Sequence, residues 1–101
     1  MIVRFARRKD ENQSPIVGAL RQIGVYVHDA SASGGGLTDL ICVYRGRVVL
    51  IEIKDGSKPP SRRKLTPAQV DFHEGCRTHG YVIPIVETVD QALALFGAKP
   101  V

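Results

Sequence analysis

The segment from Thr38 to Lys54 constrains the fold of this chain more than any other part of the sequence. It contains two runs rich in β-branched and aliphatic residues, joined by Arg45-Gly46, and its acidic residues lie only at the outer ends. Two such runs separated by two residues that include a glycine are typical of a β-hairpin with a tight turn. We therefore predict a hairpin in which Tyr44 lies opposite Arg47.

This register brings two carboxylates together. Counting outward from the turn places Asp39 opposite Glu52, and opposed residues of an antiparallel pair share a face with Cβ atoms about 4.5–5.5 Å apart. Lys54 lies on the same face as Glu52, because side chains alternate along a strand. Two carboxylates this close repel each other unless a positive charge lies between them, and Mg²⁺ prefers oxygen ligands of this kind. The hairpin therefore predicts a divalent-metal site beside Lys54.

Two alternatives stay open for these residues. A bulge at Gly46 would shift the register by one residue and place Asp39 and Glu52 on opposite faces. Alternatively, the charged ends of the hairpin only reach solvent and have no chemical role. The metal site is favoured because apolar residues line both faces up to Glu52 and Lys54.

At these residues the chain resembles a known family. Asp39, followed after the hairpin by Glu52-Ile53-Lys54, is similar to the signature of the PD-(D/E)xK nucleases, whose Asp, Glu and Lys form a metal-dependent phosphodiesterase site. One departure is Thr38, because the family usually has Pro before the Asp. Thr38 is expected to shape the start of the strand and to take no part in the chemistry.

Two further segments narrow the resemblance to the small stand-alone VRR-NUC nucleases of bacteria and their phages. These are Gly34-Gly35-Gly36 before the hairpin and Leu65-Thr66-Pro67-Ala68-Gln69 after it. The similarity extends over nearly the whole chain, from about residue 10 to about residue 95. The ordered set is much more specific than the short Asp, Glu and Lys pattern alone.

The resemblance implies a role for each residue of the signature. Asp39 and Glu52 would hold Mg²⁺ or Mn²⁺, and the main-chain carbonyl of Ile53 is a candidate third ligand. Lys54 would position or deprotonate the attacking water, while the cation polarises the scissile phosphate. No organic cofactor is implied.

Two more candidates for catalytic roles follow from the resemblance, each with a structural alternative. The family places a Gln where Gln69 stands, and its amide would hold a water or a phosphate. Thr66-Pro67-Ala68-Gln69 is also a helix capping box, which accounts for Gln69 structurally. The first helix of the family supplies an acidic residue or its polar neighbour, and the matching stretch here runs from Asp10 to Gln13. Asp10 is one candidate, or else a helix N-cap, and Gln13 shares the apolar stripe of that helix.

Two basic segments are predicted to contact nucleic acid. Residues 55–64 form a Gly-, Pro- and Ser-containing loop just after Lys54, and its cations suit backbone phosphates without reading bases. Residues 1–9 form a basic N-terminal arm, for which a solvated terminus is an equal alternative. The cations of the loop are Lys58, Arg62, Arg63 and Lys64.

The composition fits a single small domain over residues 1–101. A net charge of +4 favours a polyanionic partner. Cys42 and Cys76 lie in a predicted strand and helix, which favours buried free thiols in a reducing compartment, and no paired Cys/His spacing indicates zinc. No apolar run reaches membrane-spanning length and no signal peptide is evident, so we expect a cytoplasmic protein without a membrane partner.

The order of elements predicts the fold. A helix over residues 10–23, a strand over 25–28, the hairpin, a helix from Thr66 to Gly80, a strand over 81–86 and a helix capped by Thr88 follow in turn. Both faces of the hairpin are apolar, so helices should cover both. We predict a central mixed sheet flanked by helices, with the restriction-endonuclease-like α/β fold that the resemblance implies.

The leading functional hypothesis is a Mg²⁺- or Mn²⁺-dependent DNA endonuclease. Stand-alone relatives are homodimers that cut branched DNA such as four-way junctions, and the resemblance extends this expectation to the present chain. The alternative is a catalytically inactive nucleic-acid-binding module of the same fold. A small basic adaptor for another protein is a third hypothesis, for which DNA affinity would be insensitive to salt.

Overall fold

The predicted order of helices and strands is confirmed by the computed structural model, which describes residues 12–97. Asp10 and the basic arm over residues 1–9 lie outside the described residues. The elements in chain order are α1 (Gln13–Gln22), β1 (Tyr26–Asp29), β2 (Leu40–Tyr44), β3 (Arg47–Ile53), the short 3₁₀ helix η1 (Pro60–Arg62), α2 (Pro67–Thr78), β4 (Ile85–Val86) and α3 (Val89–Ala94).

The hairpin of β2 and β3 forms the centre of a four-stranded sheet of order β1-β2-β3-β4. The first three strands are antiparallel and β4 is parallel to β3, so the sheet is mixed as predicted. Arg45 and Gly46 both have positive φ angles, of 51° and 78°, as a tight two-residue hairpin turn requires. The ladder runs without interruption from the pair Tyr44–Arg47 to the pair Leu40–Ile51, which confirms the predicted register over these residues.

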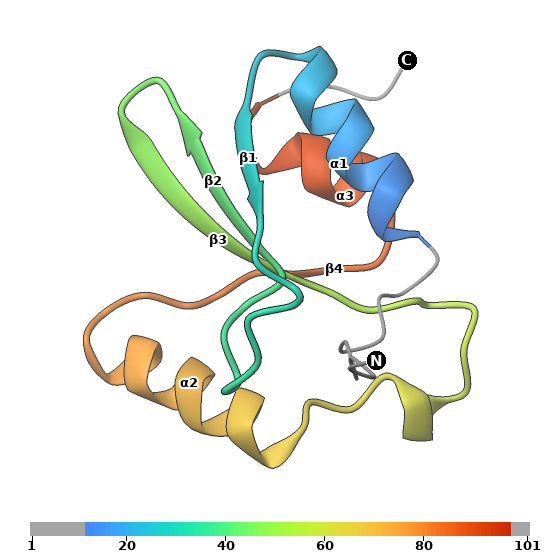
Figure 1. Cartoon of the computed structure of the whole chain (residues 1–101), viewed down its shortest axis with the longest axis vertical. Helices are drawn as coiled ribbons and strands as arrows, with labels where there is room; N and C mark the ends of the chain where they lie inside the picture. Colours follow the sequence, from blue (N-terminus) through green and yellow to red (C-terminus); the bar gives the residue numbers. More distant parts are fainter. Residues whose placement is uncertain (1–11, 98–101) are drawn as a thin grey trace, which may run out of the picture.

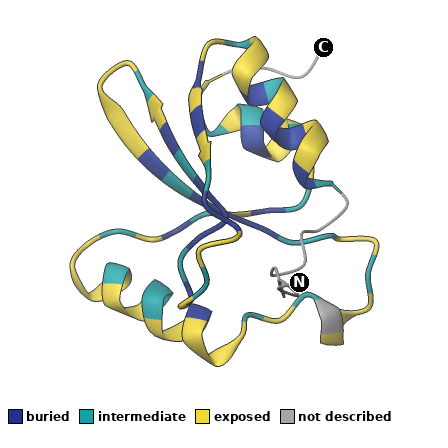
Figure 2. Cartoon of the chain, in the orientation of Figure 1, coloured by how far each residue is buried: buried dark blue, intermediate teal, exposed yellow. Residues whose placement is uncertain are grey.

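One face of the hairpin carries the hydrophobic core. Helices α1 and α3 lie together on this side of the sheet (Figure 1), and the buried residues gather between them and the strands (Figure 2). The core includes Ile16 and Leu20 of α1 together with Leu40, Cys42, Ile51 and Ile53 of the hairpin. Cys42 is a buried free thiol, as predicted, whereas Cys76 is only half-buried.

The prediction that helices cover both faces is correct only in part. On the face away from the core, Val43 and Val48 near the hairpin tip are 38% and 56% exposed. The long connection after β3 sets α2 beside the loop between β1 and β2, apart from the hairpin tip (Figure 1). Helix α2 therefore reaches this face only at the end of β3.

The N-termini of helices α1 and α2 are capped differently. Helix α2 begins with the expected capping box, in which Thr66 and Gln69 each accept a hydrogen bond from the other's backbone N–H, and Pro67 occupies the first turn. Helix α1 has Asn12 as N-cap, but the Asn12 side chain makes no capping bond. Its amide instead donates to the carbonyls of Lys54, at 3.2 Å, and Glu87, at 2.8 Å, and so ties α1 to the end of β3.

Strand β4 is shorter than the sequence predicted, because residues 81–84 do not pair as a strand. The Tyr81 hydroxyl takes over part of this role by accepting from the Leu50 N–H at 2.8 Å and donating to the Leu50 carbonyl at 3.4 Å. The Pro84 carbonyl accepts from the Glu52 N–H at 3.0 Å. These bonds provide partners for backbone N–H and carbonyl groups along the outer edge of β3. In the part of the chain that the structure describes, no helix is long and apolar enough to cross a membrane.

Candidate active site

The Glu52 carboxylate lies at the end of β3 with no exposed surface. Its neighbours Ile51 and Ile53 point into the core, so alternation along the strand turns Glu52 to the opposite face, toward α2. The Glu52 Oε2 atom accepts from the Gln69 amide at 3.3 Å, and Oε1 lies 3.1 Å from His73 Nε2. A carboxylate is costly to bury without such donors.

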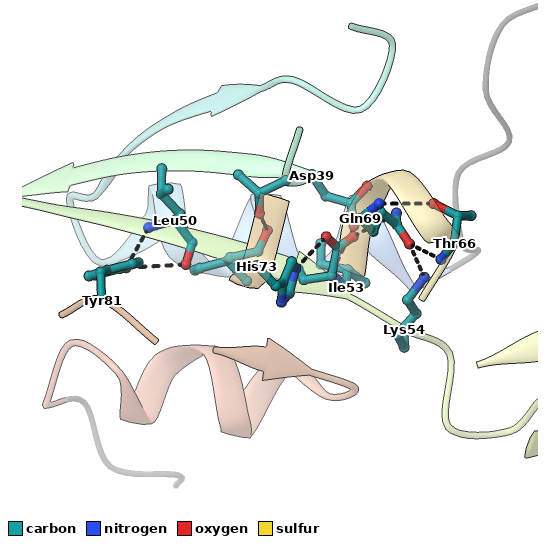
Figure 3. Close-up of polar contacts among 11 residues, drawn as sticks. Asp39, Leu50, Ile53, Lys54, Thr66, Gln69, His73 and Tyr81 are labelled. Atoms are coloured by element: carbon teal, nitrogen blue, oxygen red, sulfur yellow. Dashed lines mark hydrogen bonds and ion pairs between the residues drawn. The ribbon is translucent and has the colours of Figure 1, made fainter. Parts of the chain in front are cut away.

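Gln69 and His73 reach the same carboxylate because residues four apart lie on one face of a helix. Gln69 connects several groups of the site (Figure 3): its Oε1 atom accepts from the Thr66 N–H at 2.9 Å and from Lys54 Nζ at 3.2 Å. The helix cap, Lys54 and Glu52 are thus joined through one amide. Both interpretations of Gln69 from the sequence, helix cap and site residue, agree with this geometry.

Asp39 lies just before β2, where the confirmed register continues to a position opposite Glu52. It is 7% exposed, and its Oδ2 atom accepts from the Ile53 N–H at 2.8 Å. This bond joins the two strands beyond the end of their ladder. The register and this bond therefore bring Asp39, Glu52 and Lys54 to one end of the hairpin. Figure 3 shows Asp39, Ile53 and Lys54 at this end.

The charges at this end influence one another. The pKa of His73 is lowered, first because the imidazole is partly buried and then because of the Lys54 ammonium, while Asp39 acts in the opposite direction. The lowered pKa favours the neutral imidazole, which can donate to the Glu52 carboxylate through Nε2. Lys54 and Asp39 both lie near enough to His73 for their charges to act on it.

The polar residues at the start of α1 are placed differently. The Gln13 amide is buried and donates to Asp29 Oδ1 at 3.0 Å. Asp29 Oδ1 also accepts from the backbone N–H and the hydroxyl of Ser31. Asp29 pairs with Leu40, on the core side of the sheet, so these bonds lie on the other face from Glu52.

Contacts within the protein hold part of the basic loop after β3 in place. Asp55 accepts from the Ser57 N–H and hydroxyl, and these bonds lower the Asp55 pKa. Lys58 is half-buried and Lys64 is exposed. Arg63 is paired with Glu87 at 3.5 Å, so part of its charge is already compensated within the protein. The side chain of Arg62 is not described.

The fold of this chain is similar to that of a known domain. No model of a protein family and no curated protein matches the chain. A solved structure described as a VRR_NUC domain matches with a TM-score of 0.62 and 26% identity, over 84% of this chain and 89% of that one. The chain is therefore similar in fold to that VRR_NUC domain. The resemblance found in the sequence, and the mixed sheet flanked by helices, are thereby confirmed.

The chemistry of the oxygen donors at this end of the hairpin fits a divalent cation. Asp39 and Glu52 would supply carboxylate oxygens and Ile53 a main-chain carbonyl, and Mg²⁺ takes one or two carboxylates with waters and substrate phosphate. Within residues 12–97, no group of three or more His, Cys, Asp and Glu side chains is placed to hold one metal ion. A site here therefore needs oxygens beyond the side chains of the domain, which a phosphate group can provide.

Three contacts of the described residues were not predicted from the sequence. His73 has no role in the sequence analysis, yet it contacts Glu52. Thr38 is fully buried, and its hydroxyl donates to the Ile51 carbonyl at 2.6 Å, so it fixes the start of β2. Tyr81 was assigned only to a strand. The spacing of Gln69 and His73 on one helical face was the available signal for His73.

Proposed function

We propose that this protein is a divalent-metal-dependent DNA endonuclease that hydrolyses phosphodiester bonds. The observation that carries the proposal is the fully buried Glu52 carboxylate at the end of β3, with Asp39 and Lys54 at the same end of the hairpin. The VRR_NUC fold supports it, because that solved domain is described by a nuclease name. Buried titratable groups gathered in this way are typical of functional sites.

Each residue of the site has a proposed role. Asp39, Glu52 and the Ile53 carbonyl hold Mg²⁺ or Mn²⁺. When bound there, such a cation would supply Lewis-acid chemistry, by which a phosphate is polarised and water becomes a better nucleophile. The Lys54 side chain, held by Gln69 at 3.2 Å, positions the attacking water through its ammonium N–H groups or, as the neutral amine, receives the proton of that water. In the ammonium form it also donates to phosphate oxygens. Asp10 is proposed as a further acidic group of the site.

The DNA is proposed to lie along the loop after β3. Lys58, Arg62, Arg63 and Lys64 contact backbone phosphates, which fixes the position of the duplex without reading its sequence. We further propose selectivity for branched DNA such as four-way junctions or flaps, and a cytoplasmic location. A domain of 101 residues encloses little of a duplex, so a branched substrate gives it additional backbone to contact.

The same small size supports action as a homodimer. Several large apolar side chains are exposed, and contact between two chains would remove such side chains from water. They are Val43, Val48, Val70, Val82 and Ile85. Sedimentation equilibrium at micromolar concentration tests this part of the proposal: we expect a dimer of 22 kDa, about twice the 11.0 kDa chain. A monomer at all concentrations would refute it.

The central experiment is a cleavage assay with Mn²⁺ or Mg²⁺ on a four-way junction, a flap, a plain duplex and a single strand. Glu52→Gln and Asp39→Asn should abolish cleavage, because each removes a charge that binds the cation. Lys54→Ala should abolish cleavage and leave cation binding intact. Glu74→Gln is the matched control, since Glu74 is exposed on α2 and pairs with Arg77. The proposal fails if the wild-type protein leaves every substrate intact.

One observation favours the alternative, a nucleic-acid-binding module without turnover. The described side chains of residues 12–97 do not by themselves make a three-ligand metal site. Calorimetric titration with Mn²⁺ separates the two functions. Binding that is lost in Asp39→Asn supports the nuclease, whereas absence of binding together with salt-sensitive DNA affinity supports the alternative.

A further inference from the structure

His73 is a polar residue of the site. Neither the sequence nor the proposed mechanism assigns it a role. It lies on α2, one turn after Gln69, and its side chain is only 14% exposed. Its Nε2 atom lies 3.1 Å from Glu52 Oε1, while Gln69 Nε2 lies 3.3 Å from the other oxygen, Oε2. The two oxygens of one buried carboxylate thus have separate donors from a single helix.

Two donors are needed because the last torsion angle of a glutamate side chain has a broad distribution. The rotation of the carboxylate about its terminal bond is not fixed by a steep staggered well, so packing alone leaves its plane poorly defined. A single N–H bond, as from Gln69, still lets the second oxygen swing. A second donor on that oxygen fixes the plane of the group.

We infer that His73 is a positioning residue that holds the Glu52 carboxylate in the orientation in which it receives a divalent cation. The inference rests on the proposed function, in which Glu52 binds the cation. An ionised carboxylate has about four lone-pair sites, so N–H bonds and coordination to a cation can coexist on it. Groups that hold a metal ligand in place typically change metal affinity about 10–100-fold.

Direct coordination of the cation is the competing role of His73. The Nε2 atom cannot both donate to Glu52 and coordinate a cation. A ring nitrogen that carries the proton donated to Glu52 has no lone pair for a cation. The two roles also differ in metal preference, because imidazole suits transition metals and oxygen ligands suit both Mg²⁺ and Mn²⁺. Loss of a ligand should therefore weaken Mn²⁺ binding more than Mg²⁺ binding, whereas loss of positioning should weaken both by a similar factor.

The test is calorimetric titration of the purified full chain with MnCl₂ and, separately, with MgCl₂. We expect His73→Leu to lower both affinities about 10–100-fold and by similar factors. His73→Gln should restore most of the loss, because its Nε2 amide can donate from nearly the same place. His79→Leu is the matched control, since His79 is exposed at the end of α2 and bonds only within that helix end. Where His73→Leu does not fold, His73→Asn replaces it, because its shorter amide cannot reach Glu52.

The possible results separate this inference from the proposed function. Unchanged affinity for both cations in His73→Leu, or a loss confined to Mn²⁺, overturns the inference even if the protein cleaves DNA. Binding of both cations without cleavage of any DNA refutes only the proposed function, and the affinities of the variants still decide the role of His73. A wild-type protein that binds neither cation overturns both.

Discussion

A Cβ atom added to Gly36 would lie 2.2 Å from the carbonyl oxygen of Ala68 and 2.4 Å from its carbonyl carbon. Gly36 lies in the loop before β2, and Ala68 lies in the first turn of α2, next to Gln69. Figure 1 shows this loop beside α2. The loop backbone therefore packs directly against the helix turn that carries a residue of the site. The third glycine of the run is needed for this close approach as well as for its φ of 81°.

Gly36→Ala should consequently destabilise the protein more than Gly34→Ala. Both positions have positive φ, but Gly34 has no atom within 4 Å of an added Cβ. We expect a cost of about 1–2 kcal/mol at Gly34 from the backbone conformation, and about 1–3 kcal/mol more at Gly36 from the clash with a backbone carbonyl. Urea unfolding of the two variants measures the difference, and equal losses would contradict the close contact.

Gln69 allows the helix cap to be separated from the site. Gln69→Met should remove the bonds to Thr66, Lys54 and Glu52, and so lower cleavage and cation affinity about tenfold or more. Thr66→Ala removes the cap but leaves Gln69 in place. Both variants should lose about 1 kcal/mol of unfolding free energy. Retained cleavage in Gln69→Met, measured beside Thr66→Ala, would show that Gln69 is only a capping residue.

These two regions show which features a sequence can predict. The register of the hairpin follows from local chemistry, because the turn at Arg45-Gly46 fixes every pair from Tyr44–Arg47 outward. The capping box of α2 is equally local. The contact of Gly36 with Ala68, and that of His73 with Glu52, depend on where a long connection places α2. Local chemistry within either segment does not encode that placement. Only the family resemblance places Gln69 in the site, and helical spacing then puts His73 on the same face.

Thr38 should contribute to stability through its buried hydroxyl. Thr38→Val keeps the shape of the side chain but loses the 2.6 Å bond to the Ile51 carbonyl, at a cost of about 1–2 kcal/mol. Thr78→Val is the control, because the Thr78 hydroxyl also donates to a carbonyl, that of Gly75, but in an exposed position. Its effect should stay within about 0.5 kcal/mol. Urea unfolding that gives the same cost for both would remove any special role of Thr38.

Cys42 and Cys76 should differ in reactivity. Burial raises the pKa of the Cys42 thiol to about 11, and the reactive species is the thiolate, so iodoacetamide at pH 8 should modify Cys76 and spare Cys42 until the protein unfolds. The raised pKa also determines how the contribution of Cys42 to stability changes with pH. The unfolded thiol loses its proton near 9.0, before the folded one, so this contribution should be constant below that pH and fall between pH 9 and 11. Mass spectrometry of the alkylated protein, with Cys76→Ser as control, checks the first part and urea unfolding at pH 8 and 10 the second.

Two substitutions at the basic loop should change DNA affinity in opposite directions. Lys64 is exposed, so Lys64→Ala should weaken DNA binding and reduce the slope of log affinity against log salt by about one. Glu87→Gln should do the reverse, because it removes the acid that pairs with Arg63 at 3.5 Å and leaves that guanidinium to the phosphates. Fluorescence anisotropy with a labelled four-way junction over a range of KCl concentrations measures both slopes. Glu74→Gln is again the control, since its partner Arg77 lies on α2, outside the loop. If Glu87→Gln raised affinity no more than Glu74→Gln, the gain would reflect net charge alone, and Arg63 would not contact DNA.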